Sequence, residues 1–184
     1  MSENLVGKLL VATPLLQDPN FLRTVVLICQ ENDDGYLGLI LNRPLEATVG
    51  EHLPEWEHLV SAPARIFEGG PVQREVALAL GRRTDGGEDG SWTPIGEQLG
   101  LLDLRGTPSE LWGVVEQLRI FSGYSGWGAG QLQGELREQA WFVVDAEPGD
   151  PFAEDSEGMW RQVLRRQPGN LAMFAHFPPD PALN

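Results

Sequence analysis

Short apolar runs separated by polar and turn-forming residues recur along the chain and predict β-strands. The runs are rich in Val, Ile, Leu and aromatic residues, and Gly, Pro, Asn or Asp flank them. A polar linker that ends in Gly35 joins the second run to the third, which favours an antiparallel hairpin. The expected strands are Lys8–Ala12, Val25–Gln30, Tyr36–Leu41, Arg65–Glu68, Val76–Leu80 and Trp141–Asp145.

Apolar positions three and four residues apart predict helices, mostly in the second half of the chain. The strongest pattern covers residues 107–121, where Thr107, Pro108 and Glu110 form a capping box before an apolar stripe. Two further helices are expected over Ala129–Glu138 and Ser156–Arg166. A fourth candidate, around Val49, Leu53 and Trp56, is interrupted by Pro54.

These elements favour an α+β fold for residues 1–184 as a single domain. Strands and helices do not alternate regularly, which disfavours a doubly wound parallel sheet and favours a mainly antiparallel sheet with three or four helices packed on it. The acidic, Gly-rich segment 84–91 is expected to form a mobile loop. Residues 177–184 are expected to form an extended tail, because their prolines cannot continue a helix.

Charge excludes one class of function. The chain has 13 Lys and Arg against 27 Asp and Glu, a net charge of −14. Proteins that bind nucleic acid directly draw most of their affinity from clustered basic residues, so direct nucleic-acid binding is not expected. Arg82-Arg83 and Arg165-Arg166 are interpreted as the solvated ends of a strand and a helix.

The location of the protein is expected to be cytoplasmic. Cys29 is the single cysteine and lies in an apolar run, where it is interpreted as a buried, inert thiol suited to a reducing compartment. No apolar run approaches the length of a membrane span, and the N-terminal apolar stretch is too short for a signal peptide.

The segment Phe121–Leu132 is the most unusual in the chain, and three interpretations of it are open. The first is a serine nucleophile at Ser125, within a sequence that approaches the Gly-x-Ser-x-Gly turn of hydrolases. Asp145 and His176 follow in the order of a catalytic triad, but Trp127 stands where the motif needs glycine.

The second interpretation is a nucleotide-binding loop, and the third is structural. Gly126, Gly128 and Gly130 precede an expected helix and a strand that ends in Asp145, although the glycine spacing is one residue short of the dinucleotide motif. In the favoured structural interpretation, the glycines permit unusual backbone angles or close packing while Trp127 anchors a turn.

Metal and cofactor sites are not expected. His52 and His58 are six residues apart, off one helical face, and His176 is isolated. No Cys-x-x-Cys or His-Glu-x-x-His motif occurs, and the acidic residues lack the spacing of a calcium loop.

Two arginines are expected near the ends of the predicted hairpin. Arg23 precedes its first strand, and Arg43 follows its second, next to Asn42. Two guanidinium groups together can bind an anion, and the structural alternative is that each pairs with a carboxylate such as Asp18 or Glu68.

Several segments together resemble the YqgE/AlgH family of bacterial proteins. They occur in the family's order and cover nearly the whole chain. They are residues 7–14, 18–27, 38–44, 69–72 and 123–132, followed by Glu135 and Trp141.

The resemblance implies a single α+β domain around a strongly coiled, partly split β-sheet. It implies little about activity: the family is largely uncharacterised, no enzymatic activity is established for it, and one member carries the label of a transcriptional regulator. The family usually has Ala at the position of Ser125, which weakens the nucleophile interpretation. It usually has His in the hairpin loop, where this chain has residues 30–34 instead.

We therefore expect a non-catalytic domain that binds an unidentified protein partner or a small anionic ligand. An enzyme, either a serine hydrolase at Ser125 or a nucleotide-dependent activity at the glycine-rich segment, is the alternative. The arginines and the aromatic, glycine-rich segment are expected to line one shared cleft. Its candidate residues are Arg23, Asn42, Arg43, Gly70, Tyr124, Trp127 and Gln131.

Overall fold

A computed structural model describes residues 3–85 and 91–178. Over these residues the chain forms a curled, mainly antiparallel sheet of ten strands. The predicted α+β class is confirmed. The strands are β1 (Lys8–Ala12), β2 (Val25–Asn32), β3 (Gly35–Ile40), β4 (Pro44–Thr48), β5 (Arg65–Glu68), β6 (Val72–Arg83), β7 (Trp92–Ile95), β8 (Leu99–Leu102), β9 (Val115–Gly128) and β10 (Trp141–Asp145).

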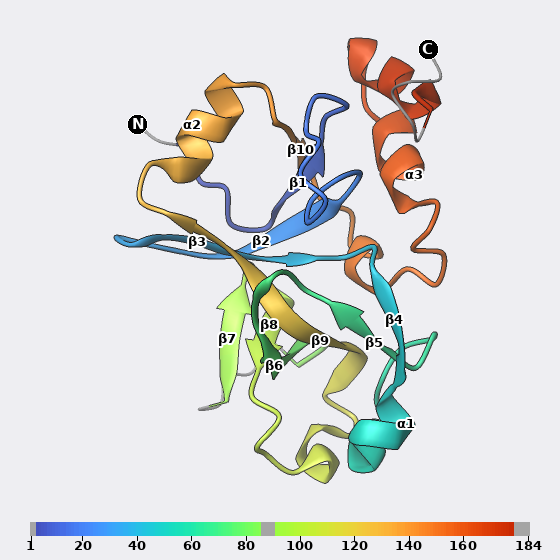
Figure 1. Cartoon of the computed structure of the whole chain (residues 1–184). Coiled ribbons are helices and arrows are strands. Elements are labelled where there is room, and N and C mark those ends of the chain that lie inside the picture. Colours follow the sequence, from blue (N-terminus) through green and yellow to red (C-terminus); the bar gives the residue numbers. More distant parts are fainter. Residues whose placement is uncertain (1–2, 86–90, 179–184) are drawn as a thin grey trace.

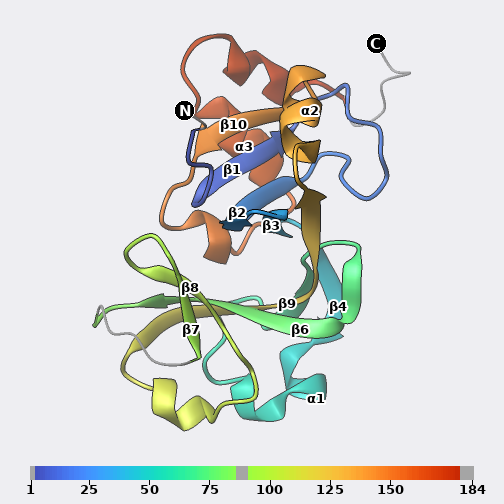
Figure 2. The same ribbon diagram turned by 90° about the vertical axis from the view of Figure 1, so that its left-hand side faces the viewer.

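Strand β9 connects two halves of the sheet. Its C-terminal part pairs with β3, and its N-terminal part pairs with β6 and, in parallel, with β5. One half contains β10, β1, β2 and β3 in that order, with helices α2 (Gln131–Arg137) and α3 (Met159–Arg165). We call it the α2/α3 half. The other contains the remaining strands and helix α1 (Val49–His52), and we call it the α1 half (Figures 1 and 2).

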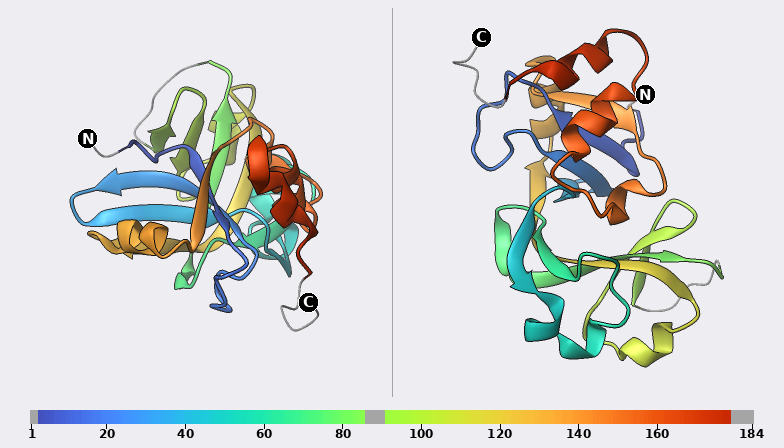
Figure 3. Two further views of the ribbon diagram at one scale, coloured as in Figure 1. Left: turned by 90° about the horizontal axis from the view of Figure 1, so that it is seen from above. Right: turned by 90° about the vertical axis from the view of Figure 1, so that its right-hand side faces the viewer.

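Helices cover both faces of the sheet in the α2/α3 half. Helix α2 lies on one side of these strands and α3 on the other (Figure 3). Residues 25–29 of β2 are therefore all buried, whichever way their side chains point. Such continuous apolar runs are typical of strands that are covered on both faces. The Cys29 thiol is buried as predicted, and this burial raises its pKa.

Short helices cover the outer surface of the α1 half. Helix α1 and the 3₁₀ helices Pro54–Trp56 and Pro108–Leu111 place Val49, Trp56 and Leu111 against the sheet. Thr48 caps α1 by accepting a hydrogen bond from the Glu51 N–H.

A buried arginine on β9 holds three segments together. Arg119 is 1% exposed and donates hydrogen bonds to the carbonyl oxygens of Pro151, Ala153 and Ala62. Its guanidinium lies 4.4 Å from the ring centroid of Phe67. Burial lowers the pKa of Arg119 to about 10, which still leaves the group charged at neutral pH.

The predicted helix over residues 107–121 is wrong. The chain makes only the single 3₁₀ turn Pro108–Leu111, and Gly113 then adopts the left-handed conformation, with φ +84°. From Val115 onward the chain is strand β9. Its partners β5 and β6 precede it by tens of residues, so their pairing overrides the local helical spacing.

The other differences concern the extents of elements. Strand β6 is longer than expected, and β4, β7 and β8 were not expected. Helices α2 and α3 confirm two predicted helices with shorter bounds, and the fourth candidate divides at Leu53 into α1 and a 3₁₀ helix. The C-terminal segment also contains an unexpected 3₁₀ helix, Gly169–His176.

Two further expectations fall partly outside the described residues. Within the expected loop 84–91, residues 86–90 lie outside them, and so do residues 179–184 of the expected tail. Phe177 has the extended backbone that was expected.

Gly35 permits the close pairing of β3 with β9, and its replacement tests that pairing. In Gly35→Ala, the new Cβ would lie 1.7 Å from the Trp127 carbonyl oxygen, at a φ of +133°. We expect a loss of at least about 2 kcal/mol in the free energy of unfolding, measured by urea denaturation.

Gly149→Ala is the matched control. Gly149 has a φ of −82°, and a methyl group added there would have no atom within 4 Å, so stability should be unchanged or slightly higher. Equal effects of the two substitutions would contradict the account of Gly35.

Candidate functional site

Asn42 and Arg43 hold the loop 18–24 in place. The Arg43 guanidinium donates to the carbonyl oxygens of Pro19, Asn20 and Leu22. The Asn42 side chain accepts from the Val25 N–H and donates to the Arg23 carbonyl oxygen. Partial burial lowers the pKa of Arg43. Both side chains therefore satisfy backbone groups of the loop that its own turns leave without partners.

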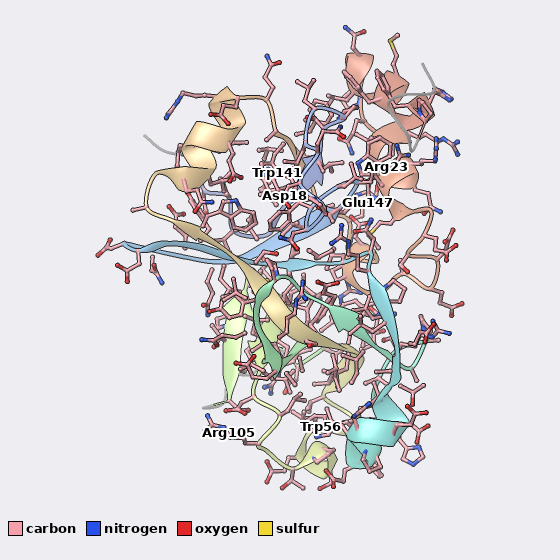
Figure 4. All side chains as sticks on the ribbon, in the orientation of Figure 1. Asp18, Arg23, Trp56, Arg105, Trp141 and Glu147 are labelled. Atoms are coloured by element: carbon pink, nitrogen blue, oxygen red, sulfur yellow. The ribbon has the colours of Figure 1, made fainter. Side chains whose placement is uncertain are left out.

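The Arg23 side chain points toward α3. Its guanidinium lies 3.9 Å from the centroid of the Trp160 ring and donates to the carbonyl oxygens of Phe177 and Pro178. Burial, and then the nearby charge of Arg161, lower the pKa of Arg23. Figure 4 shows Arg23 on the α3 side of this half and Trp141 farther toward α2.

Trp127 lies in the opposite layer, beneath α2. It is 3% exposed and packs on Phe21 and Trp141, with ring centroids 6.1 and 6.0 Å away. The Glu135 carboxylate accepts hydrogen bonds from the indole N–H groups of both tryptophans, at 2.9 and 2.8 Å. Gln131 also donates to Glu135 and accepts from the Gly128 N–H. Trp127 is thus an anchor for α2 and presents no open aromatic wall.

Gly70 and Tyr124 lie where two segments of the backbone approach closely. A Cβ on Gly70 would lie 2.2 Å from the Tyr124 carbonyl carbon. Tyr124, Gly126 and Trp127 line a shallow hollow of about 400 Å³, whose rim on the β2–β3 hairpin includes Asn32 and Asp34. Its lining contains no Lys or Arg and one carboxylate, that of Asp34, so the hollow does not suit an anion.

The predicted site residues therefore do not line one concavity. Arg23 packs in the layer beneath α3, and Trp127 packs in the layer beneath α2, because the sheet separates them. The arginine cluster and the tryptophan cluster are linked instead through the loop 18–24. Arg43 binds this loop on one side, and its Phe21 contacts Trp127 on the other. The segments that carry the family resemblance fix this loop.

Ser125 is buried in strand β9. Its hydroxyl donates to the Gly69 carbonyl oxygen at 3.1 Å, and the side chain is fully buried. His176 is exposed at the end of the C-terminal 3₁₀ helix. A serine in this position lacks the access that a nucleophile needs.

The glycine-rich segment is strand rather than loop up to Gly128. Gly126 pairs with Leu37 and Gly128 with Gly35 in the β3–β9 ladder. The turn that was expected around Trp127 is therefore wrong, because pairing with β3 extends β9 to Gly128, shortly before α2 begins. Backbone groups in a ladder are not free to hold a pyrophosphate.

An apolar groove lies at the end of the α2/α3 half, and sequence reasoning missed it. It has a volume of about 480 Å³ and opens between the end of α2, the start of β10 and the C-terminal segment. Its lining is mostly aromatic and aliphatic. The lining residues are Thr13, Pro14, Leu15, Leu136, Gln139, Trp141, Phe142, Phe174 and Phe177.

Apolar side chains remain exposed around this groove. Of the lining residues, Leu15 is 69% exposed and Phe177 36%. Phe174 contacts both Phe142 and Phe177, with ring centroids 5.0 and 5.4 Å apart. Phe174 and Phe177, close to the C-terminus, are a sequence signal for this groove. The sequence pattern assigns Phe174 to no helix or strand and Phe177 to the expected tail.

Comparison with known proteins identifies the family. Residues 9–172 match the model of the AlgH-like family. The chain belongs to the AlgH-like family. The resemblance inferred from the sequence segments is thereby confirmed.

Bacterial relatives of the AlgH-like chain match along nearly its whole length. A UPF0301 protein of Streptomyces coelicolor is 48% identical over 186 residues, covering 98% of this chain and 96% of the relative. A UPF0301 protein of Thermobifida fusca is 47% identical over 190 residues, with the same coverage.

Two solved structures share the fold. The crystal structure of a Corynebacterium diphtheriae protein has a TM-score of 0.89 and 30% identity, covering 96% of this chain and 94% of that one. The solution structure of the AlgH protein from Pseudomonas aeruginosa has a TM-score of 0.72 and 29% identity, covering 97% and 98%.

Two kinds of feature are absent from residues 3–85 and 91–178 of the AlgH-like chain. No three His, Cys, Asp or Glu side chains in these ranges gather closely enough to hold a metal ion. None of the helices in the same ranges has the length and apolar character needed to cross a bilayer.

Removal of the Glu135 carboxylate tests the anchor beneath α2. Glu135→Ala leaves the indole N–H groups of Trp127 and Trp141 without their acceptor, and we expect a loss of about 2 kcal/mol in unfolding free energy. Urea denaturation followed by tryptophan fluorescence measures it. Glu138→Ala, at the exposed end of the same helix, should change stability by less than about 0.5 kcal/mol. Similar losses in the two variants would contradict this role.

Ser125→Ala tests the structural role of the serine. The Gly69 carbonyl oxygen also accepts the Ile40 N–H, at 2.9 Å, so it keeps a partner and the loss should stay below about 1 kcal/mol. A fluorophosphonate probe should not label the wild-type protein. Labelling that Ser125→Ala abolishes would show instead that the serine is a nucleophile.

Proposed function

We propose that this AlgH-like protein is a non-catalytic binding domain of the cytoplasm that engages a protein partner at the apolar groove beside Phe177. The observation that carries the proposal is the exposure of Leu15 and Phe177, which line a preformed, mostly aromatic groove. Exposed apolar side chains that gather around one concavity are typical of interaction sites.

A protein segment suits this groove better than a small anion. The lining is dominated by leucine, proline and aromatic side chains, whose burial on binding supplies the main favourable free energy. Full burial of one Leu side chain is worth about 2 kcal/mol. Aromatic residues are enriched in the cores of protein interfaces, and tryptophan is frequent among binding hot spots.

The non-catalytic part of the proposal rests on the residues that could do chemistry. The buried Ser125 donates to a backbone carbonyl, and the glycine-rich segment is taken up in a strand ladder. These features disfavour the alternatives, a serine hydrolase or a nucleotide-dependent enzyme. A regulatory role would act through the partner, since a net charge of −14 disfavours direct contact with nucleic acid. The free, buried Cys29 suits a reducing cytoplasm.

Site-specific photocrosslinking tests the proposal. A benzoylphenylalanine is placed at position 15, beside the groove, and in a second variant at position 116, on an exposed site of β9 in the α1 half. We expect a discrete crosslinked species in cells from position 15 and none from position 116. The crosslinked protein is then purified and titrated against wild type and Leu15→Glu.

The titration decides the outcome. A charged side chain at the rim should weaken binding by about tenfold or more, since burial of an unpaired carboxylate opposes apolar contact. The proposal is overturned if both positions crosslink alike, or if Leu15→Glu binds the purified partner as tightly as wild type.

A further inference from the structure

The outer edge of strand β10 is open. Among the described residues, β10 pairs only with β1, and it forms one end of the sheet. The Ala12 N–H donates to Thr24, so alternate residues of β1 face β2 and the others, including Leu9 and Val11, face β10. Antiparallel pairing thus directs the N–H and C=O groups of Phe142 and Val144 toward β1.

The alternate residues of β10 direct their backbone groups outward. They are Trp141, Val143 and Asp145, and the Asp145 carbonyl oxygen indeed accepts from Arg166, at 3.5 Å. Looking down on this end of the molecule, Figure 3 shows the strand with α2 on one side and α3 on the other. The outward N–H and C=O groups of Trp141 and Val143, with the Asp145 N–H, form the alternating pattern with which an added strand pairs, while Arg166 occupies the Asp145 carbonyl oxygen.

The strand at the other end of the sheet differs. Strand β7 contains Pro94, which has no N–H and is typical of protected edges. Strand β10 has the sequence WFVVD, with no proline and three apolar β-forming residues in a row after the tryptophan. Pro94 thus protects the β7 end of the sheet against strand addition, and the β10 end has no proline.

The groove lies at the start of this open edge. Trp141 and Phe142, the first two residues of β10, form part of its lining. An extended chain that pairs with β10 therefore passes the groove with one of its side chains positioned to enter it.

Two arginines beside the groove have no carboxylate partner among residues 3–85 and 91–178. Arg23 and Arg161 both donate to the carbonyl oxygen of Phe177, which lines the groove, at 3.1 and 3.4 Å. Neither belongs to an ion pair in the part of the chain that the structure describes. Both guanidinium groups donate only to backbone carbonyl oxygens in the described part of the chain, so their positive charges are complementary to a carboxylate.

We propose that the partner binds by strand addition: an extended segment pairs with the open edge of β10, inserts an apolar side chain into the groove and presents an Asp or Glu to Arg23 and Arg161. The inference rests on the proposed function and specifies the partner as an extended segment that carries an apolar residue and an Asp or Glu. Backbone pairing supplies the register, and the groove and the arginines select the side chains.

Selected peptides test this mode of binding. Random dodecapeptides displayed on phage are selected on the purified wild-type protein, and the enriched peptides are synthesised. Each is titrated against wild type, Leu15→Glu, Val143→Pro, Arg161→Gln and Arg165→Gln. Val143→Pro removes an outward N–H and no bond to β1, and Arg165 is an exposed control on the same helix as Arg161.

We expect enriched peptides to combine apolar residues with Asp or Glu. Their affinity should fall about tenfold in Val143→Pro and in Arg161→Gln, equivalent to one or two lost hydrogen bonds, and stay unchanged in Arg165→Gln. Bound peptide should also slow amide exchange of Val143 and Asp145 in the wild-type protein by about tenfold or more. This measurement decides the question alone if Val143→Pro does not fold.

The outcomes separate the two proposals. Peptides that lose affinity for Leu15→Glu but leave the exchange of Val143 and Asp145 unchanged overturn strand addition and retain the groove. Peptides without acidic residues, insensitive to Arg161→Gln, overturn the role of the arginines. Failure to select any peptide that is sensitive to Leu15→Glu counts against the proposed function itself.

Discussion

Pairing along β9 is the interaction on which the architecture depends. This one strand of 14 residues takes part in three ladders, with β3, β5 and β6. Neither half of the sheet is complete without it, and its closest approaches need residues without side chains. Gly35 and Gly70 each meet the backbone of β9 at distances that no Cβ tolerates. Within the segment Phe121–Leu132 the same holds for Gly123, where a Cβ would lie 2.6 Å from the Gly70 carbonyl oxygen.

The polar residues Asn42 and Arg43, in the segments that resemble the family, fix the loop 18–24. The loop 18–24 lies between the two layers of the α2/α3 half, and several of its backbone groups take hydrogen-bond partners from outside the loop. Arg43 and Asn42 supply them on one side, while Phe21 joins the aromatic cluster that Glu135 organises on the other. A charged group that satisfies several carbonyl oxygens or indole N–H groups at once fixes a loop more firmly than single neutral contacts would.

The fold class and most of the strands could be predicted from local pattern, because runs such as residues 25–29 combine β-branched residues with flanking turns. The segment 107–121 could not, because its apolar spacing suits a helix equally well and its strand partners lie far away in sequence. For the site, the sequence predicts that Arg23 and Trp127 line one cleft, whereas the sheet separates them. The groove was missed because Leu15 looks like any other core leucine. Its exposure depends on which elements pack around it, and local sequence does not encode that.

The buried Arg119 restricts how the protein can move. Its guanidinium joins strand β9 to the segment between β10 and α3 and to the chain just before β5. A bend between the halves would separate a charged group from carbonyl oxygens without offering it water, at a cost of several kcal/mol. Bending between the two halves at Arg119 is therefore energetically unfavourable. In the binding mode that we propose, the edge of β10 acts as a rigid template, and the conformational adjustment on association is made by the partner segment.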